Sequence, residues 1–497
     1  NAHDHITFAN NPPKGHGTER YEHRHDWRKG IRGHKKISVA GGASQDVVRA
    51  LRKSPAVADG TLSVGGQTAS DMDATEFVRE KTPYAIGFVM GVSYVILFLL
   101  LGFPAPQAWA DDAALNLPLG DPARRDQEAP LLLDAITDTR KGDTLAPVEL
   151  AARLAGVRLL FVGESHTNHE FHQAQLRIVQ ELARSGRQVL IGLEMYPYPE
   201  QAHLDRWVAG GLTEEAFLEE SRWYKNWGYH WNYYRDIFLF ARDHKLRMFA
   251  VNPPREVVSA VRKRGFLDLT EEEAAHIPGK IDTESAEHRR LFRAFFTEED
   301  AMHSALTEEQ WEGMFRAQCT WDATMAYNAI QALQANGGPD AIMVVLIGAG
   351  HVAYDLGAPR QAALWFKGKT ASLIPIPVIG DKGERVKVRA SYAQFLWGLP
   401  KETDPVYPSL GLSTPERKPA EFFPVIAVQK DSVAARSGFV EGDLLVSMDT
   451  MPLTDKETLN RLMAGKRWGD TARFEIRRGD KMLTLITAFR RRETETR

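Results

Sequence analysis

Four short apolar runs, each six to eight residues long, constrain the fold of this chain more than any other sequence feature. They are Arg158–Gly163 (RLLFVG), Gln188–Glu194 (QVLIGLE), Arg247–Asn252 (RMFAVN) and Ala341–Gly348 (AIMVVLIG). Strands that are apolar on both faces suit a parallel sheet covered by helices on each side. The stretches between them are helical in pattern, as in Glu170–Ser185. We therefore predict an α/β domain with a mostly parallel, helix-flanked sheet over residues 146–400.

The length and composition limit the remaining possibilities. A chain of 497 residues is too long for one hydrophobic core, so we expect more than one domain. The formal net charge of −3 gives no general attraction to nucleic acid, and no nucleic-acid partner is predicted. The single cysteine, Cys319, excludes an intrachain disulfide framework and a cysteine-built metal centre. Cys319 is expected to be a buried, small apolar residue in a helix.

Three other segments have distinct compositions. Residues 111–145 are rich in Asp, Pro and Ala and are predicted to be a linker. Residues 265–335 are predicted to be mostly helical, with acidic helix starts after Thr270 and Thr307. Residues 381–400 are polar, which predicts a connector or edge structure.

An uncharged segment, Pro83–Phe103, indicates where the protein resides. Arg79 and Lys81 precede it, and Ala108-Trp109-Ala110 follows it. A basic flank, an apolar run and a small-residue site are the parts of a secretory signal peptide, so residues 72–110 are predicted to be one, cleaved after Ala110. The alternative is a retained membrane anchor, because about 20 apolar residues can span a bilayer. Either interpretation predicts an exported protein, periplasmic or anchored by residues 83–103 and facing the periplasm.

The segment before this leader, residues 1–71, is rich in Gly, His, Arg and Lys and has no long apolar periodicity. It is predicted to be a disordered or non-native extension. Its histidines form a His-rich tract that suggests metal binding, although a solvated basic tail is the simpler interpretation. They are His3, His5, His16, His23, His25 and His34.

Charged and imidazole side chains follow three of the four apolar runs. Glu164 and His166 follow the first, Glu194 closes the second, and His351 follows the last in a Gly-Ala-Gly-His sequence. Loops at the carboxyl edge of an open parallel sheet converge on one crevice, where ligands bind. We therefore expect Glu164, His166, Glu194 and His351 to share one functional site, although a lone His or Glu at a strand end is usually a capped or solvated residue.

These motifs resemble the ChaN-like haem-binding uptake family of the Tiki superfamily. The resemblance is carried by Val162–Gln175 (VGESHTNHEFHQAQ), Leu193-Glu194-Met195, the stretch Tyr234–Pro253, Gln318-x-x-x-Asp322-x-x-Met325-Ala326 and IGAGHV. It implies an α/β fold and a role in binding haem for iron acquisition. The family commonly has a His-His pair where this chain has Phe171-His172, so His172 alone carries over.

The resemblance implies two alternative chemistries. In the first, the site binds haem through a cofactor-binding set in which His166, His351 or Tyr196 is the axial ligand. That set comprises Glu164, His166, His172, Glu194, Tyr196 and His351. In the second, the protein is a metal-dependent hydrolase or protease, as others in the superfamily are. His166 and His351 would then bind a divalent metal with the two carboxylates, Glu164 or Glu194 acting as general base. The sequence leaves a homo-oligomer open.

An aromatic-rich segment, Trp223–Tyr234 (WYKNWGYHWNYY), lies between the second and third runs. Its rings would stack well on a flat macrocycle, but aromatic residues at helical spacing usually belong to a core. Tyr224, Tyr229 and His230 are the candidates for ligand contact. Arg235 and Arg255 follow them and would suit haem propionates or ordinary surface ion pairs.

The C-terminal residues 405–492 resemble a bacterial PDZ domain. The run Ser432–Leu445 and the elements after it carry that resemblance. It implies a small β-sandwich-like α+β domain that binds the C-terminus of a protein or peptide partner as an added strand. The expected peptide-binding residues are Leu410, Gly411, Leu412, Leu459 and Leu462. A packing module of the same shape without a peptide ligand is the alternative.

Overall fold

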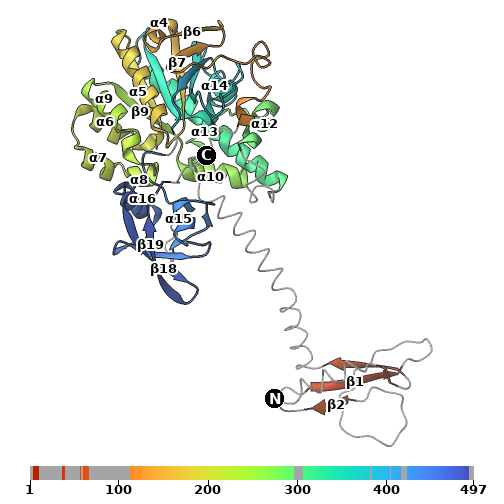
Figure 1. Ribbon diagram of the computed structural model, residues 1–497. Coiled ribbons are helices and arrows are strands. Elements are labelled where there is room, and N and C mark those ends of the chain that lie inside the picture. The colour runs from red at the N-terminus through yellow and green to blue at the C-terminus, as the bar shows by residue number, and fades with distance from the viewer. Residues whose placement is uncertain are drawn as a thin grey trace, which may run out of the picture. The chain divides into compact units, whose positions relative to one another are not determined.

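The structure is a computed structural model of the full chain (Figure 1), and it describes residues 4–10, 36–39, 56–57, 60–65, 112–295, 306–380, 383–402, 405–415 and 423–491. The chain divides into two compact units, Asn1–Ile96 and Leu97–Arg497. The predicted signal peptide or anchor, residues 72–110, lies outside the described residues. Within the described ranges, no helix has the length and apolar character needed to cross a bilayer.

The first unit contains a four-stranded antiparallel sheet in the order β2-β1-β4-β3. Its strands are β1 (Asp4–Asn10), β2 (Lys36–Val39), β3 (Ala56–Val57) and β4 (Gly60–Gly65). These short stretches of the segment predicted to be a disordered or non-native extension form strands in the structure. The register places Ile6 opposite both Ile37 and Val64, and Phe8 opposite Leu62. Apolar residues alternate with polar ones over these short stretches, which is a strand pattern too short to give long-range periodicity.

The second unit is built on an eight-stranded sheet in the order β6-β5-β12-β11-β7-β10-β8-β9. Its strands are β5 (Ile136–Asp138), β6 (Asp143–Leu145), β7 (Val157–Glu164), β8 (Val189–Pro197), β9 (Arg247–Asn252), β10 (Ile342–Gly348), β11 (Lys369–Pro377) and β12 (Phe395–Leu399). The six strands from β12 to β9 are parallel, whereas β5 pairs antiparallel with both of its neighbours, β12 and β6. This confirms the mostly parallel α/β fold and all four apolar runs as its central strands.

Helices cover both faces of this sheet (Figure 1). They are α3 (Asp112–Leu115), α4 (Leu150–Arg153), α5 (His169–Arg184), α6 (Gln201–Ala209), α7 (Glu214–Glu220), α8 (Trp223–Asn226), α9 (Arg235–Asp243), α10 (Arg255–Arg264), α11 (Glu271–Ala274), α12 (Ala286–Ala294), α13 (Glu308–Asn336) and α14 (Ala358–Ala362). The expected helix starts are confirmed, because the side chains of Thr270 and Thr307 cap α11 and α13 in capping boxes.

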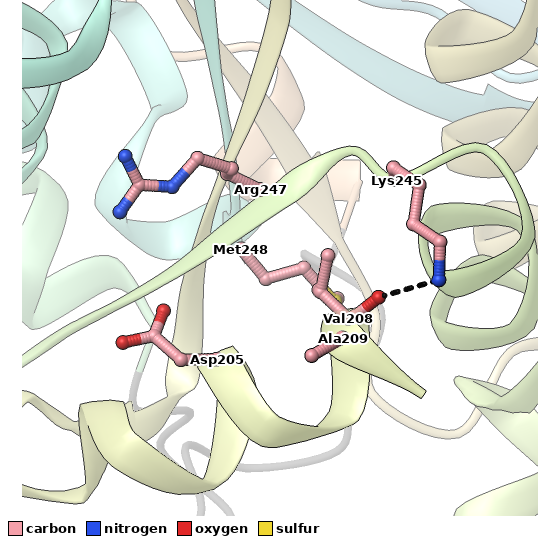
Figure 2. A pocket seen from close by; sticks show the side chains of 6 residues that line it. All are labelled: Asp205, Val208, Ala209, Lys245, Arg247 and Met248. Carbon is pink, nitrogen blue, oxygen red and sulfur yellow. Dashed lines mark hydrogen bonds between the residues drawn. The ribbon is translucent and has the colours of Figure 1, made fainter. Parts of the chain in front are cut away.

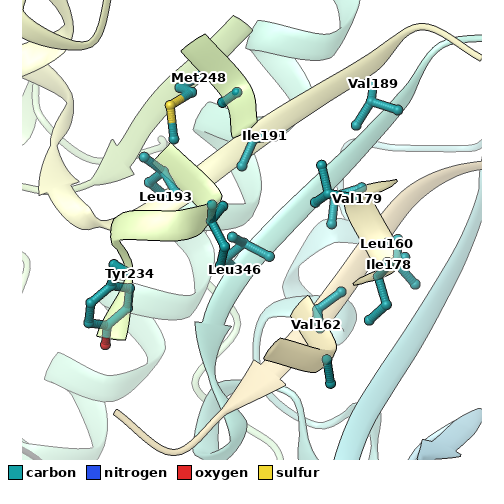
Figure 3. Packing of buried hydrophobic residues seen from close by; sticks show 14 of the residues in the cluster. Leu160, Val162, Ile178, Val179, Val189, Ile191, Leu193, Tyr234, Met248 and Leu346 are labelled. Atoms are coloured by element: carbon teal, nitrogen blue, oxygen red, sulfur yellow. The ribbon is translucent and has the colours of Figure 1, made fainter. Parts of the chain in front are cut away.

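The strands bury both of their faces, which produces two hydrophobic cores. Leu160 and Val162 of β7 point into one core with Ile178 and Val179 of α5 (Figure 3). Leu159 and Phe161 point into the other, with Met325 of α13 and its neighbours. Burial of alternate residues on opposite faces explains why the runs are apolar throughout and not alternating.

Two segments predicted to lie outside the sheet belong to it. Described residues 112–145, predicted as a linker, supply β5 and β6, and Ile136 is fully buried in the core. In the segment 381–400, predicted to be a connector or edge structure, β12 lies between β11 and β5 and buries all five of its residues. Both errors have one cause: three- to five-residue strands gain most of their hydrogen bonds from neighbours distant in sequence, so local composition is a poor guide to them.

The C-terminal part has its own small core around Phe474 and Ile476. Its elements are β13 (Leu412–Ser413), β14 (Phe423–Pro424), β15 (Ala427–Val428), α15 (Val433–Arg436), β16 (Leu444–Met448), β17 (Met451–Pro452), α16 (Lys456–Ala464), β18 (Thr471–Arg478) and β19 (Lys481–Ala488). The strands are antiparallel, in one sheet ordered β14-β16-β18-β19 with β17 beside β16, and in a β13-β15 pair.

Candidate functional site

The sheet order brings the three chemistry-bearing strand ends together. β10 lies between β7 and β8, and its register puts Gly348 opposite Glu164 and Leu346 opposite Leu193. Glu164, Glu194 and the loops with His166 and His351 therefore emerge at the same edge, although nearly 190 residues separate the first from the last (351 − 164 = 187). The structure thus brings the four residues to one edge of the sheet, as expected.

The first half of the site is organised around the buried carboxylate of Glu164. Its Oε1 lies 2.7 Å from Nδ1 of His166 and accepts a hydrogen bond of 2.9 Å from the hydroxyl of Tyr234. Burial opposes ionisation of Glu164, but its contacts with His172, His166 and Tyr234 hold its pKa below the usual value. Burial also disfavours the charged form of His166, yet the bond to Glu164 raises the pKa of this imidazole. Glu164 and His166 thus form a buried ion pair.

His172 lies behind this pair and not at its open side. The imidazole is 1% exposed, and its Nδ1 lies 3.4 Å from Oε2 of Glu164. Its Nε2 donates to the main-chain oxygen of His166 at 3.2 Å. Burial lowers the pKa of His172, which keeps the ring neutral. His172 therefore supports the loop and the carboxylate and does not face a ligand.

The second half of the site is organised around His351. Its Nδ1 lies 2.6 Å from Oδ1 of Asp322 on α13, and its Nε2 lies 3.5 Å from Oε1 of Glu194. The other oxygen of Glu194 accepts a 2.6 Å hydrogen bond from the main-chain N–H of Gly348. Burial works against a charged imidazole, but Asp322 first and then Glu194 raise the pKa of His351 to about 10. His351 is therefore an imidazolium flanked by two carboxylates.

Gly348 separates the two imidazoles. A Cβ atom at this position would lie 3.3 Å from Cε1 of His166 and 3.6 Å from Cδ2 of His351. Both rings thus pack over the same backbone atom, and a larger residue would push them. Each ring directs Nδ1 to a buried carboxylate, and Nε2 is left as the nitrogen that can meet a ligand. This is the orientation that a supporting carboxylate gives to a metal-ligating or acid–base histidine.

An aromatic wall, defined here as Trp227 and Tyr229, closes the His166 side. The centroids of both rings lie 4.8 Å from that of His166. Among the described residues, no group hydrogen-bonds the buried hydroxyl of Tyr229. Burial, and then the charges of Glu194 and Glu164, raise the pKa of Tyr229 far above neutrality. Its proton is therefore retained and available to a ligand.

Several site residues were not predicted. The sequence motifs include Asp322 but indicate no role for it, and they indicate none for His288 or Tyr234. His288 on α12 places Nε2 3.5 Å from Oδ2 of Asp322, and burial lowers its pKa to about 4. Gln318 also contacts Nδ1 of His351 at 2.9 Å. The four-residue spacing of Gln318 and Asp322, one helical turn, is the signal that could have indicated a shared face.

Other expected ligands lie away from the crevice. Tyr196 is fully buried, and its hydroxyl bonds Oγ of Ser221 at 2.8 Å, so it is not presented as an axial ligand. Arg235 pairs with Glu214, and Arg255 donates to the main-chain oxygen of Asn226. Cys319 is buried as expected, and burial raises its thiol pKa.

Two cavities of the second unit lie away from this site. One of about 330 Å³ is lined by Asp205, Val208, Ala209, Lys245, Arg247 and Met248, and Lys245 there donates to the main-chain oxygen of Val208 (Figure 2). A larger one, about 830 Å³, lies at the amino edge of the sheet, near Arg158 and Arg187. Within the described residues, no three His, Cys, Asp or Glu side chains are arranged to hold a metal ion. The candidate crevice is therefore defined by two partly exposed imidazoles, since the side chains of His166 and His351 are 16% and 15% exposed.

The C-terminal domain presents the expected groove residues. Gly411 has a φ of 71°, and a Cβ there would lie 2.4 Å from Cβ of Ser432, so this turn requires glycine. Leu410 and Leu459 are buried in the domain core, and Leu412 and Leu462 are partly buried against it. Leu412 on β13 and Leu462 on α16 are therefore the ones a peptide could reach.

Fold and site together define an α/β protein with paired histidine–carboxylate groups at the carboxyl edge of its sheet, followed by a small antiparallel domain. Residues 150–362 match the family described as haem-binding uptake, Tiki superfamily, ChaN, and residues 408–488 match the PDZ domain family. The chain thus contains a ChaN-type domain of the Tiki superfamily followed by a PDZ domain.

Several solved structures match parts of this chain at low sequence identity. A structure described as cofacial haem binding to ChaN of Campylobacter jejuni is 16% identical and covers 54% of this chain and 98% of its own, with a TM-score of 0.41. The type III effector HopBA1 is 10% identical over 52% of this chain and 94% of its own, with a TM-score of 0.31. The HtrA3 PDZ domain, bound to a phage-derived ligand, is 23% identical and covers 16% of this chain and 82% of its own, with a TM-score of 0.15. No curated protein matches the sequence.

Proposed function

We propose that this protein binds haem at the carboxyl edge of its sheet and serves haem or iron uptake as an exported protein. In this proposal the PDZ domain recruits a protein partner by its C-terminus. The observation that supports haem binding is the match of residues 150–362 to a haem-binding family, together with the two imidazoles that this domain turns toward one crevice.

The donor set of the crevice fits haem iron. His166 and His351 each have Nδ1 bonded to a buried carboxylate, so Nε2 is the atom by which each ring would ligate iron. Nε2 of His351 lies 3.5 Å from Glu194, and its proton would have to leave before it could ligate. Ferric haem supplies an iron that accepts axial nitrogen or oxygen ligands. Trp227 and Tyr229 offer ring surfaces beside His166, and the Tyr229 hydroxyl offers a hydrogen-bond donor. Glu164 and Asp322 orient the two rings and do not themselves contact the ligand.

A haem titration of the full chain tests this function. We expect a shifted and saturable Soret band that weakens in the variants His166→Ala and His351→Ala. His244→Ala is the matched control, because His244 is an exposed histidine at the end of α9. A spectrum indistinguishable from haem in buffer would overturn the proposal.

A metal-dependent hydrolase is the second candidate, and one observation favours it. Carboxylates and imidazoles alternate along the crevice, and Glu194 keeps one oxygen 3.5 Å from Nε2 of His351. A carboxylate in that place can act as general base toward an attacking water. A metal at His166 and His351 would first have to displace the proton held by His351, so its binding would release protons.

Metal analysis and a peptide and ester hydrolysis screen separate the two candidates. Hydrolysis that is lost on chelation and in both Glu164→Gln and Glu194→Gln would establish the enzyme. Haem binding without hydrolysis in the wild-type protein would exclude it. Export is tested independently, by cell fractionation and by N-terminal sequencing for a start at Asp111.

A further inference from the structure

The segment Arg222–Tyr234 contacts the His166 site on one side and the PDZ domain on the other. On one side, Trp227 and Tyr229 pack against His166, and Tyr234 donates to Glu164. On the other, the segment meets the PDZ domain, where α16 lies beside α8 (Figure 1). A single stretch of 13 residues (234 − 222 + 1) thus connects the haem-site candidate with the peptide-binding domain.

The helix α16 uses one face for this contact. Glu457 pairs with Arg222 at 2.5 Å, and the side-chain amide of Asn460 donates to the main-chain oxygen of Tyr224 at 3.1 Å. Ala464 accepts a 2.9 Å hydrogen bond from Nε2 of His230. Positions 457, 460 and 464 fall on one side of a helix with 3.6 residues per turn, whereas Leu459 and Leu462 fall on the opposite side. The groove face and the docking face of α16 are therefore back to back.

Two features make the contact close. Gly228 has a φ of 86°, and a Cβ there would lie 2.9 Å from the amide nitrogen of Asn460, so glycine permits this approach. His230 is bonded at both nitrogens, because Nδ1 accepts from the main-chain N–H of Asn232 while Nε2 donates to Ala464. Its ring also stacks on Tyr407, with centroids 3.7 Å apart. The docking is thus specified by direct hydrogen bonds and by ring packing.

We infer that α16 of the PDZ domain is a positioning element of the His166 site, because it holds the segment that carries the aromatic wall. The inference deepens the proposed function, on which its haem readout rests. A peptide that binds against Leu462 acts on the same helix, so the groove and the crevice share one structural element. Allosteric coupling between two sites requires such a shared element.

The test uses the full chain and the variant Asn460→Arg. A long side chain at 460 has no room against Gly228 and breaks the docking from the PDZ side, without changing any residue of the crevice. Arg461→Ala is the matched control, since Arg461 is the next residue of α16 and is exposed. The ion pair Arg222–Glu457 is a poorer target, because Arg222 is half exposed and such pairs contribute little.

Three measurements are made on each variant. They are hydrogen–deuterium exchange over residues 223–234, the imidazole NMR signal of His166, and the haem dissociation constant. In Asn460→Arg we expect faster exchange in 223–234, a shifted His166 signal and a change in the haem dissociation constant of about fivefold or more. Arg461→Ala should leave all three unchanged.

The outcomes that overturn the inference are distinct from a failure of haem binding. Unchanged exchange in Asn460→Arg would mean that the domains do not dock in solution. Faster exchange with an unmoved His166 signal would mean that docking does not position the site. Neither readout needs haem, so a wild-type protein that binds no haem would sink the proposed function and leave this test intact.

Discussion

The two histidines of the crevice have the same local geometry and different surroundings. His166 is held by one carboxylate, Glu164, and by two aromatic rings, whereas His351 lies between two carboxylates, Asp322 and Glu194. The surroundings of His166 are therefore dominated by aromatic rings, and those of His351 by charged groups. The pKa of both imidazoles is raised, but the groups around them differ, so the two halves should respond differently to substitution and to pH.

The largest effect is expected from removing the carboxylate that the His166 half depends on. Glu164→Ala would leave the buried imidazole of His166 without its carboxylate partner, and Tyr234 without its acceptor. Loss of one partner of a buried ion pair costs about 3–5 kcal/mol of the free energy of unfolding. Urea denaturation measures it, with Glu219→Ala, at an exposed position on α7, as a control near zero. A cost below about 1 kcal/mol would contradict the ion pair.

The His351 half should respond to pH more than to packing. The pKa of His351 is about 10 in the folded protein and 6.5 in the unfolded chain, so its stabilisation is complete below pH 6.5 and is lost as pH rises toward 10. The loss should be on the order of 3 kcal/mol. Denaturation at pH 7 and pH 10 measures it, and His351→Gln should remove this part of the pH dependence. An unchanged pH dependence in His351→Gln would refute the assignment.

His288 should show the opposite sign. Its pKa falls from 6.5 to about 4 on folding because burial favours the neutral ring. Its contribution is therefore present above pH 6.5 and is lost as pH falls through 4. Denaturation at pH 7 and pH 4.5 compares wild type with His288→Gln, which should be less sensitive to acid. Equal sensitivity in both would contradict this.

A substitution between the two halves should disturb both. Gly348→Ala places a methyl group 3.3 Å from the ring of His166, which should cost about 1–3 kcal/mol in unfolding and shift the NMR signals of both imidazoles. Gly279→Ala is the control, because a Cβ there meets no atom within 4 Å. If only one imidazole responds, the two rings do not share this contact.

The smallest effect is expected from a single hydroxyl. Tyr234→Phe removes one donor to Glu164 and should cost about 1–2 kcal/mol, while His166 keeps its pair. Tyr327→Phe, at a half-buried tyrosine outside the crevice, provides the comparison in the same denaturation experiment. A Tyr234→Phe cost equal to that of the comparison variant would show that this hydrogen bond contributes nothing.

The sequence was sufficient for the central strands and for the four residues at their ends. Continuous apolar runs have few alternatives to buried parallel strands, and the edge rule for such sheets then places Glu164, His166, Glu194 and His351 together. It was insufficient where neighbours distant in sequence decide. The short strand β5 pairs with β12 and β6 pairs with β5, and the composition around β12 predicts only a connector or edge structure.

The same reason explains the unpredicted site residues. Whether the face of α13 with Asp322, or the side of α12 with His288, turns toward His351 depends on how those helices pack, which no local pattern records. Tyr196 shows the converse. It is only two residues beyond Glu194, yet its hydroxyl hydrogen-bonds Ser221, at the end of α7, and lies outside the site. Sequence proximity to a site residue did not predict membership of the site.

The position of β10 also governs the order in which the protein can be assembled. β7 and β8 do not pair with each other and meet only through β10, which is made about 150 residues after β8 ends (342 − 197 = 145). A ribosome-bound chain that ends before residue 342 therefore lacks the strand that joins the two halves of the sheet. Such a nascent chain exposes the edges of β7 and β8, and these edges are a target for chaperones or for aggregation until translation supplies the missing strand.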